Sequence, residues 1–219
     1  ILYALLGLAP VLLGCSKADD AAPGLASSKG CSEVLVVPVS AHGVSKADAA
    51  TANSLFARNN LDNRTFRYTR YSRESVQTYF PPYAAFDSQV VGVEEYASGL
   101  PVFTATSNFL FKDGAFHYRA GKPFAGTSLS AVPALKPGQL RALFEATINK
   151  VDPQRGNLQN KCVNVEFGYY DLNAGTSNAA ENLVKAWRVT LKNEPYPFAY
   201  YEDKDGRLIY YDNGFRTFR

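Results

Sequence analysis

An interval of 92 residues recurs between two unlike features of this chain. The tripeptide Lys-Asp-Gly at 112–114 returns at 204–206, and the two expected helix starts, Ser45 and Pro137, lie the same distance apart. A shared interval between unlike features indicates an internal repeat, so the two halves should contain the same elements. We therefore expect an α+β fold of two repeated units, each a helix packed on an antiparallel β-meander.

The spacing of apolar residues predicts one helix in each half. Ser45 can cap a helix over 45–60, and Pro137 suits the first turn of a helix over 137–150. Runs of β-branched and aromatic residues between turn signals predict the strands. These are 34–39, 65–71, 89–96, 102–111 and 115–118 in the first half, and 163–171, 183–191, 198–202 and 208–211 in the second.

Two Asp-Gly pairs predict hairpin turns. Asp113-Gly114 separates the last two strands of the first half, and Asp205-Gly206 separates the last two of the second. For the second turn we expect three residues with Gly206 in the left-handed conformation. That register would place Asp203 opposite Arg207, an attractive cross-strand pair.

The first 14 residues are apolar and uncharged, and they are too few to cross a bilayer core, which needs about 20. They lead into Leu-Leu-Gly-Cys at 12–15, which resembles a bacterial lipobox. We expect 1–14 to be a lipoprotein signal peptide truncated at its start, Cys15 to be lipidated and 15–32 to be a tether. The protein would then be anchored in the bacterial cell envelope, at the outer membrane, with display on the cell surface left open. The alternative is a buried helix with a free cysteine.

Composition excludes several classes of protein. The net charge of +3, from 23 Lys plus Arg against 20 Asp plus Glu, is too balanced for a nucleic-acid partner. Hydrophobic residues at 46% and charged residues at 20% exclude a disordered chain. Two His and three Cys leave little material for a metal centre, and we expect neither a metal nor a cofactor.

Cys31 and Cys162 remain once Cys15 is assigned to the anchor. Disulfides can form in the cell envelope, so a bridge between these two cysteines is one interpretation. Two separate buried thiols are the other, because sequence does not show proximity.

The residues 95–103, Glu-Tyr-Ala-Ser-Gly-Leu-Pro-Val-Phe, resemble the Y-x-x-G-(I/L)-P-V-F signature of the FTP domain. The segments 186–190 and 199–208 resemble the PepSY pattern A-W-x-V followed by Y-x-x-D-x-x-T-G-x-(L/V), with Glu202 and Asp205 replacing the family's Asp and Thr. The resemblance implies an FTP-like domain over 33–126 and a PepSY-like domain over 127–219. In that family these domains precede a thermolysin- or fungalysin-type metalloprotease, assist its folding and block its active site.

No catalytic motif accompanies this resemblance. The sequence lacks HExxH, G-x-S-x-G, a P-loop and G-x-G-x-x-G, so we expect no enzymatic activity and no catalytic residue. Cys162 with His42 or His117 is a remote candidate for a thiol–imidazole pair. Because no zinc-protease motif follows in the 219 residues, any effect on a protease should be exerted in trans.

Tyrosines gather in the second half of the chain, where adjacent residues on a strand face opposite sides of the sheet. An exposed tyrosine face with basic residues nearby suits a polypeptide partner, although Tyr is also simply a good strand residue. We expect a non-catalytic envelope lipoprotein that inhibits or chaperones a secreted metalloprotease. The alternative is a structural or ligand-binding surface lipoprotein without a protease partner. The candidate binding residues are Tyr200, Tyr201, Tyr210, Tyr211, Lys204 and Arg207.

Overall fold

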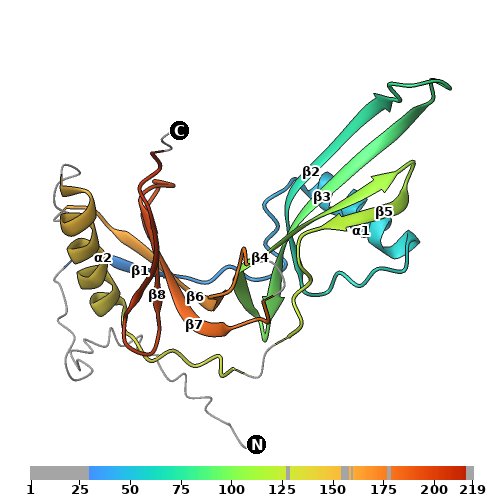
Figure 1. Cartoon of the computed structure of the whole chain (residues 1–219). Helices are drawn as coiled ribbons and strands as arrows, with labels where there is room; N and C mark the ends of the chain where they lie inside the picture. The colour runs from blue at the N-terminus through green and yellow to red at the C-terminus, as the bar shows by residue number, and fades with distance from the viewer. Residues whose placement is uncertain (1–29, 127–128, 154–157, 159, 177–178, 216–219) are drawn as a thin grey trace, which may run out of the picture.

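The computed structural model describes residues 30–126, 129–153, 158, 160–176 and 179–215, so the expected signal peptide, Cys15 and most of the tether lie outside the described residues. Two helices and nine strands make up this part of the chain (Figure 1). In order they are β1 (Ser32–Leu35), α1 (Lys46–Arg58), β2 (Phe66–Gln77), β3 (Ala85–Ala97), β4 (Leu100–Lys112), β5 (Ala115–Ala120), α2 (Pro137–Val151), β6 (Val163–Asp171), β7 (Leu183–Leu191), β8 (Phe198–Glu202) and β9 (Leu208–Asp212).

The expectation of two repeated helix-on-meander units is wrong. The described strands form one mixed sheet in the order β2-β3-β4-β6-β7-β8-β9, with β1 also paired to β6 and β5 to β4. β6 joins the halves because it runs parallel to both β1 and β4, with Val102 beside Tyr169. A strand edge left open exposes unpaired backbone groups, and this pairing covers part of the edges of β4 and β6. The predicted domain boundary at 126/127 falls beside residues outside the described part and stays a prediction.

α1 covers the first half of the sheet. Ser45 caps it as predicted, since its Oγ accepts a hydrogen bond from the Asp48 N–H at 3.1 Å. The buried face of α1 presents Ala52, Leu55 and Phe56 to the sheet. They pack in one core cluster with Phe66, Tyr68, Val91, Val93, Phe109 and Phe111 from β2, β3 and β4.

α2 covers one face of the strands of the second half (Figure 1). Pro137 begins the helix, as the sequence predicts, and the Gln139 side chain accepts a hydrogen bond from the Lys136 N–H at 2.9 Å. Leu140, Phe144 and Ile148 form its apolar stripe. They pack against Val163, Val165, Phe167, Trp187, Val189, Leu191, Ala199 and Tyr201. Every sheet residue in this cluster has an odd number, so the even-numbered side chains of β6, β7 and β8 face away from α2.

The hairpin turns are partly as predicted. Asp113 and Gly114 both have positive φ, and they link Lys112 to Ala115 as a two-residue turn. Gly206 is left-handed, with φ of +72°, as expected. The predicted register is wrong, because Arg207 forms its ion pair with Glu202 at 2.6 Å and not with Asp203.

Asp203 is instead fully buried and binds four donors. Its carboxylate accepts hydrogen bonds from the backbone N–H groups of Ala134 and Leu135 at 2.9 and 3.0 Å, and from Trp187 Nε1 at 2.8 Å. It also forms an ion pair with Lys185 at 3.0 Å. A buried charge is tolerated only when it is paired and hydrogen-bonded, so these contacts fix the segment before α2 onto the sheet.

We expect Asp203→Asn to lower the free energy of unfolding by about 3–5 kcal/mol, because one partner of a buried ion pair is removed while its donors stay buried. Asp205→Asn is the matched control, since Asp205 is exposed in the same turn. Urea denaturation of both variants measures the difference. Equal, small effects in the two variants would contradict the role of Asp203.

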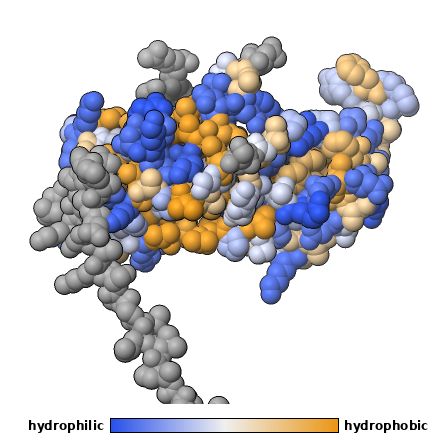
Figure 2. All heavy atoms as spheres, turned by 90° about the horizontal axis from the view of Figure 1, so that it is seen from below, coloured by the Kyte–Doolittle hydropathy of each residue, from blue (hydrophilic) through white to orange (hydrophobic). Residues whose placement is uncertain are grey.

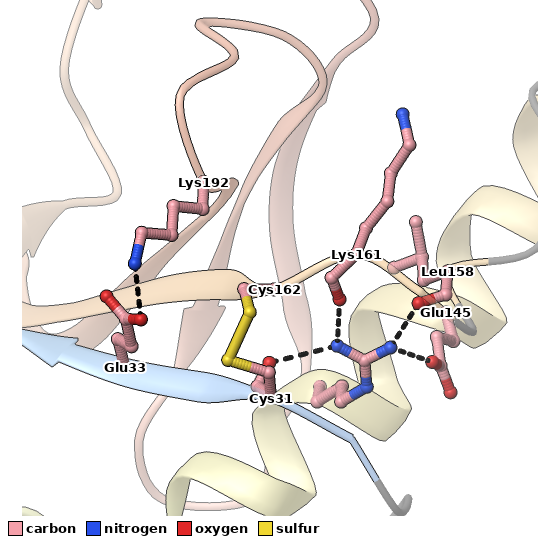
Figure 3. Close-up of a disulfide and its surroundings, with 8 residues drawn as sticks. Cys31, Glu33, Glu145, Leu158, Lys161, Cys162 and Lys192 are labelled. Atoms are coloured by element: carbon pink, nitrogen blue, oxygen red, sulfur yellow. Dashed lines mark hydrogen bonds and ion pairs between the residues drawn. A yellow bond between two sulfur atoms is a disulfide. The ribbon is translucent and has the colours of Figure 1, made fainter.

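The structure pairs Cys31 with Cys162, at a Cα–Cα distance of 4.5 Å, at the start of the parallel β1–β6 pairing (Figure 3). Arg141 of α2 is fully buried beside the bridge. Its guanidinium donates to the carbonyl oxygens of Cys31 at 3.0 Å, of Lys161 at 2.6 Å and of Leu158, and it forms an ion pair with Glu145 at 3.0 Å. One side chain thus ties α2 to both strands that the disulfide joins.

The disulfide closes a loop with a sequence separation of 131 residues. Because a long closed loop restricts the unfolded chain, we expect Cys31→Ser/Cys162→Ser to lose about 3–5 kcal/mol of stability under oxidising conditions. Under reducing conditions the double variant and the parent chain should unfold at similar urea concentrations. Peptide mapping without reductant should recover the Cys31–Cys162 peptide, and its absence would remove the bridge.

Candidate functional site

A single row of side chains crosses the sheet face that α2 leaves open. Glu166 on β6 pairs with Arg188 on β7, Arg188 with Tyr200 on β8, and Tyr200 with Tyr210 on β9. Each strand contributes the residue that its alternation turns away from α2. Four consecutive strands therefore present a carboxylate, a guanidinium and two phenols side by side.

Aromatic rings surround this row and form what we call the aromatic face: Phe103, Tyr170, Phe198, Tyr200 and Tyr210. Tyr200 is at the centre, with ring centroids 5.0 Å from Tyr170, 5.1 Å from Phe103 and 5.7 Å from Phe198. Tyr210 lies at the outer end and is 44% exposed, whereas the others are half-buried. The face thus combines a packed interior with an accessible ring at the last strand.

Phe103 reaches this face because β4 crosses close to β6. A Cβ atom on Gly168 would lie 2.5 Å from the Pro101 carbonyl oxygen and 2.9 Å from the Phe103 ring, so only glycine fits there. The Phe103 ring also lies 5.6 Å from the Arg188 guanidinium carbon, a cation–π arrangement. Phe103, the last residue of the FTP-like segment 95–103, is therefore part of the aromatic face.

Glu166 and Arg188 form an ion pair at 2.5 Å at the inner end of the row. The Glu166 side chain is only 6% exposed, and burial raises its pKa above 4.5 although the Arg188 charge opposes the shift. Burial likewise raises the pKa values of Tyr200 and Tyr170, so both phenols stay protonated at neutral pH. The face therefore offers aromatic rings and hydrogen-bonding hydroxyls beside an ion pair whose Arg188 side chain is partly exposed.

The raised pKa of Glu166 makes the stability of the folded protein depend on pH. The folded protein binds the Glu166 proton more tightly than the unfolded chain does, so the contribution of this carboxyl group to the free energy of unfolding is fully present below about pH 4.5. That contribution is lost as the pH rises through the raised pKa. The stability of the parent chain relative to Glu166→Gln should therefore fall as the pH rises above about 4.5. Urea denaturation across this range measures it, with the exposed Glu74→Gln as baseline. A rise with pH would mean that Arg188 outweighs burial.

The structure separates the six binding residues expected from the sequence. Tyr200 and Tyr210 lie on the aromatic face. Tyr201 is buried on the opposite side, where its hydroxyl bonds Thr147 at 2.8 Å, and Tyr211 packs against the same core. Lys204 and Arg207 are exposed in the β8–β9 turn, and Arg207 already pairs with Glu202.

Sequence reasoning missed Glu166, Arg188 and Phe103 as members of this face. Opposite charges at 166 and 188 are a cross-strand pair only if the register of β6 and β7 is known, and an 11-residue connection hides that register. Phe103 was part of the FTP-like signature, but its contact with β6 depends on the parallel pairing, for which the sequence offers no local signal.

Among the described residues, the cysteine pair, Glu33 and His42 have structural partners. In the described residues the one cluster with metal-ligand types is Cys31, Glu33 and Cys162, where the sulfurs are paired and Glu33 binds Lys192 at 2.5 Å. His42 accepts a hydrogen bond from the Tyr68 N–H at 3.2 Å and stacks on its ring, and burial lowers its pKa. His117 is exposed on β5. Neither histidine therefore pairs with Cys162.

A cavity of about 970 Å³ opens where β4, the segment after β5 and the β6–β7 connection meet. Its walls are mainly small apolar residues. Its charged groups bind the backbone: Asp171 accepts from Asn173 and Asn182, Glu181 accepts from Ala125, and Lys122 donates to Ala179. These bonds hold the walls in place.

No model of a known protein family matches the chain, and no curated protein matches its sequence. Within the described ranges, no helix is long and apolar enough to span a bilayer.

Proposed function

We propose that this chain is a non-catalytic lipoprotein of the bacterial cell envelope that binds a polypeptide partner. The partner is a secreted metalloprotease, which the chain inhibits or chaperones in trans. The class of partner comes from the resemblance of 95–103 to FTP sequences and of 186–190 and 199–208 to PepSY sequences. The place of contact comes from the aromatic face.

The observation that carries the proposal is the position of the aromatic face beside a sheet edge. β9 is the last strand in the sheet order, so its outer edge pairs with no other described strand. An extended segment of a partner can add to such an edge through its backbone, while its side chains meet groups on the neighbouring strands. Tyr210 lies on β9 itself, directly opposite Tyr200.

The chemistry of this edge suits a polypeptide. Tyrosine rings bury a large apolar area while their hydroxyls keep a hydrogen-bonding position, and interfaces are enriched in them. Glu202, Lys204 and Arg207 lie at the turn that ends the β8–β9 pair, so charged groups border the aromatic face. An apolar centre with a charged border is the usual anatomy of a protein interface.

The proposal predicts that Tyr210 anchors the partner. The full chain with Cys15→Ser, immobilised without its acyl group, should capture a zinc-dependent protease from envelope extract and suppress its activity. Adding Tyr210→Ala should weaken capture at least about tenfold, because truncating a tyrosine that anchors an interface costs about 2 kcal/mol or more and about 1.4 kcal/mol is a factor of ten. Tyr118→Ala is the matched control, since Tyr118 is 51% exposed on β5, in the other half of the chain.

Suppressed protease activity that returns with Tyr210→Ala but not with Tyr118→Ala supports the proposal. Capture without any zinc-protease activity, or equal effects of the two variants, contradicts it. That outcome would favour the alternative, a structural or ligand-binding surface lipoprotein with no protease partner.

A further inference from the structure

The β2–β3 hairpin extends well past the rest of the sheet (Figure 1). β4 accompanies β3 only as far as the pairing of Lys112 with Ser88, whereas β2 and β3 continue together to the pairing of Gln77 with Ala85. Residues 75–87 therefore form an arm that is supported by no third described strand. In Figure 2 its end stands clear of the body at the upper right.

The end of this arm is uncharged and aromatic. The twelve residues from 75 to 86 include no Asp, Glu, Lys, Arg or His. Tyr79, Phe80 and Tyr83 at the tip are 86%, 74% and 66% exposed. Three such side chains at one projecting point form an exposed apolar group that the described fold does not use, and a group of this kind marks an interaction site.

The tip holds its own backbone in place. The Thr78 N–H donates to the Ala84 carbonyl oxygen at 3.0 Å, the Thr78 hydroxyl donates to the Pro82 carbonyl oxygen at 3.0 Å, and the Ala84 N–H donates to the Thr78 hydroxyl at 2.9 Å. These bonds satisfy the N–H groups of Thr78 and Ala84, and each polar group that is satisfied internally lowers the cost of entering an apolar environment.

Charged residues begin abruptly at the base of the arm. Arg73 pairs with Asp87 at 2.5 Å, Lys112 lies 4.3 Å from the centre of the Phe86 ring, and Glu74 is exposed nearby. The hairpin therefore changes from uncharged residues at 75–86 to charged residues at 73, 74 and 87 within one or two positions on each strand. Both signs of charge are present at this boundary, so the base has no basic patch to attract anionic lipid.

We propose that this tip inserts into the interfacial region of a lipid bilayer. Tyr and Phe side chains favour that region because their rings are apolar and the tyrosine hydroxyl can stay hydrated. A protein partner is less well supported, because the tip is convex and three side chains offer less than the roughly 800 Å² per partner of a stable interface. This inference goes beyond the proposed function and does not require the metalloprotease.

The placement of the tip also bears on orientation. The start of β1 and the tip lie at opposite ends of the molecule (Figure 1). The 15 residues at 16–30 can span at most about 50 Å, so a chain anchored at Cys15 stays close to the membrane that its tip would contact. A weak second contact then suffices, because the anchor holds it at a high effective concentration.

Single tryptophan reporters test insertion in the full chain carrying Cys15→Ser. Phe80→Trp places a reporter at the tip, and Tyr118→Trp places a matched reporter on β5. The native Trp187 is buried and supplies a constant background. With vesicles of brominated phosphatidylcholine, we expect Phe80→Trp fluorescence to shift to the blue and to be quenched several-fold more than that of Tyr118→Trp. Because the reporters read their local surroundings, attachment through 1–14 does not imitate the result.

A triple variant of the tip and the lipid dependence of the quenching test insertion further. The variant Tyr79→Ser/Phe80→Ser/Tyr83→Ser should retain the circular dichroism of the folded chain. It should lose vesicle contact at the hairpin, so that vesicles no longer protect residues 75–86 from proteolysis. Quenching of Phe80→Trp should change little with added salt or phosphatidylglycerol, because the charges at the base are mixed. Equal quenching of both reporters, or quenching that requires phosphatidylglycerol, would overturn the proposal.

Discussion

The parallel pairing of β6 with β1 and β4 is the constraint on which the rest of the structure depends. β6 brings the strands of both halves into one mixed sheet, because one part of its edge pairs with β1 and another part with β4. The Cys31–Cys162 pair and the buried Arg141 connect β6 to the start of β1. At the other contact, the absence of a side chain at Gly168 lets β4 approach β6 closely.

The candidate binding face is a consequence of this packing. Once α2 covers the odd-numbered residues of β6, β7 and β8, the even-numbered ones must face the other way. That side receives Glu166, Arg188 and Tyr200, and the crossing of β4 adds Phe103. The Glu166 carboxylate is buried against Arg188, and the accessible groups on this side are the aromatic rings, their hydroxyls and part of the Arg188 side chain, with Tyr210 the most exposed ring of the aromatic face.

Local patterns in the sequence predicted the elements well. Ser45 and Pro137 begin their helices as expected, and the bounds of β6, β7 and β8 agree with the predicted strands. Errors arose where a residue's role depends on distant partners. Asp203 was expected to face Arg207, but its contacts with Trp187, Lys185 and the segment before α2 outweigh a cross-strand pair of exposed charges. Tyr201 was expected as a binding residue, but the alternation of β8 turns it into the core.

By itself, the sequence determined where both helices and the strands β6, β7 and β8 begin, because capping residues, turn glycines and apolar spacing act over a few neighbouring positions, whereas β1 and β3 begin earlier than predicted. It also supplied the cysteine pair and the uncharged aromatic segment at 75–86. Only the tertiary structure decided that the halves share one sheet, which tyrosines are accessible, and that the aromatic segment projects beyond its neighbours. Those outcomes depend on strand order and register, which are set by contacts between residues far apart in the chain and have no local signature.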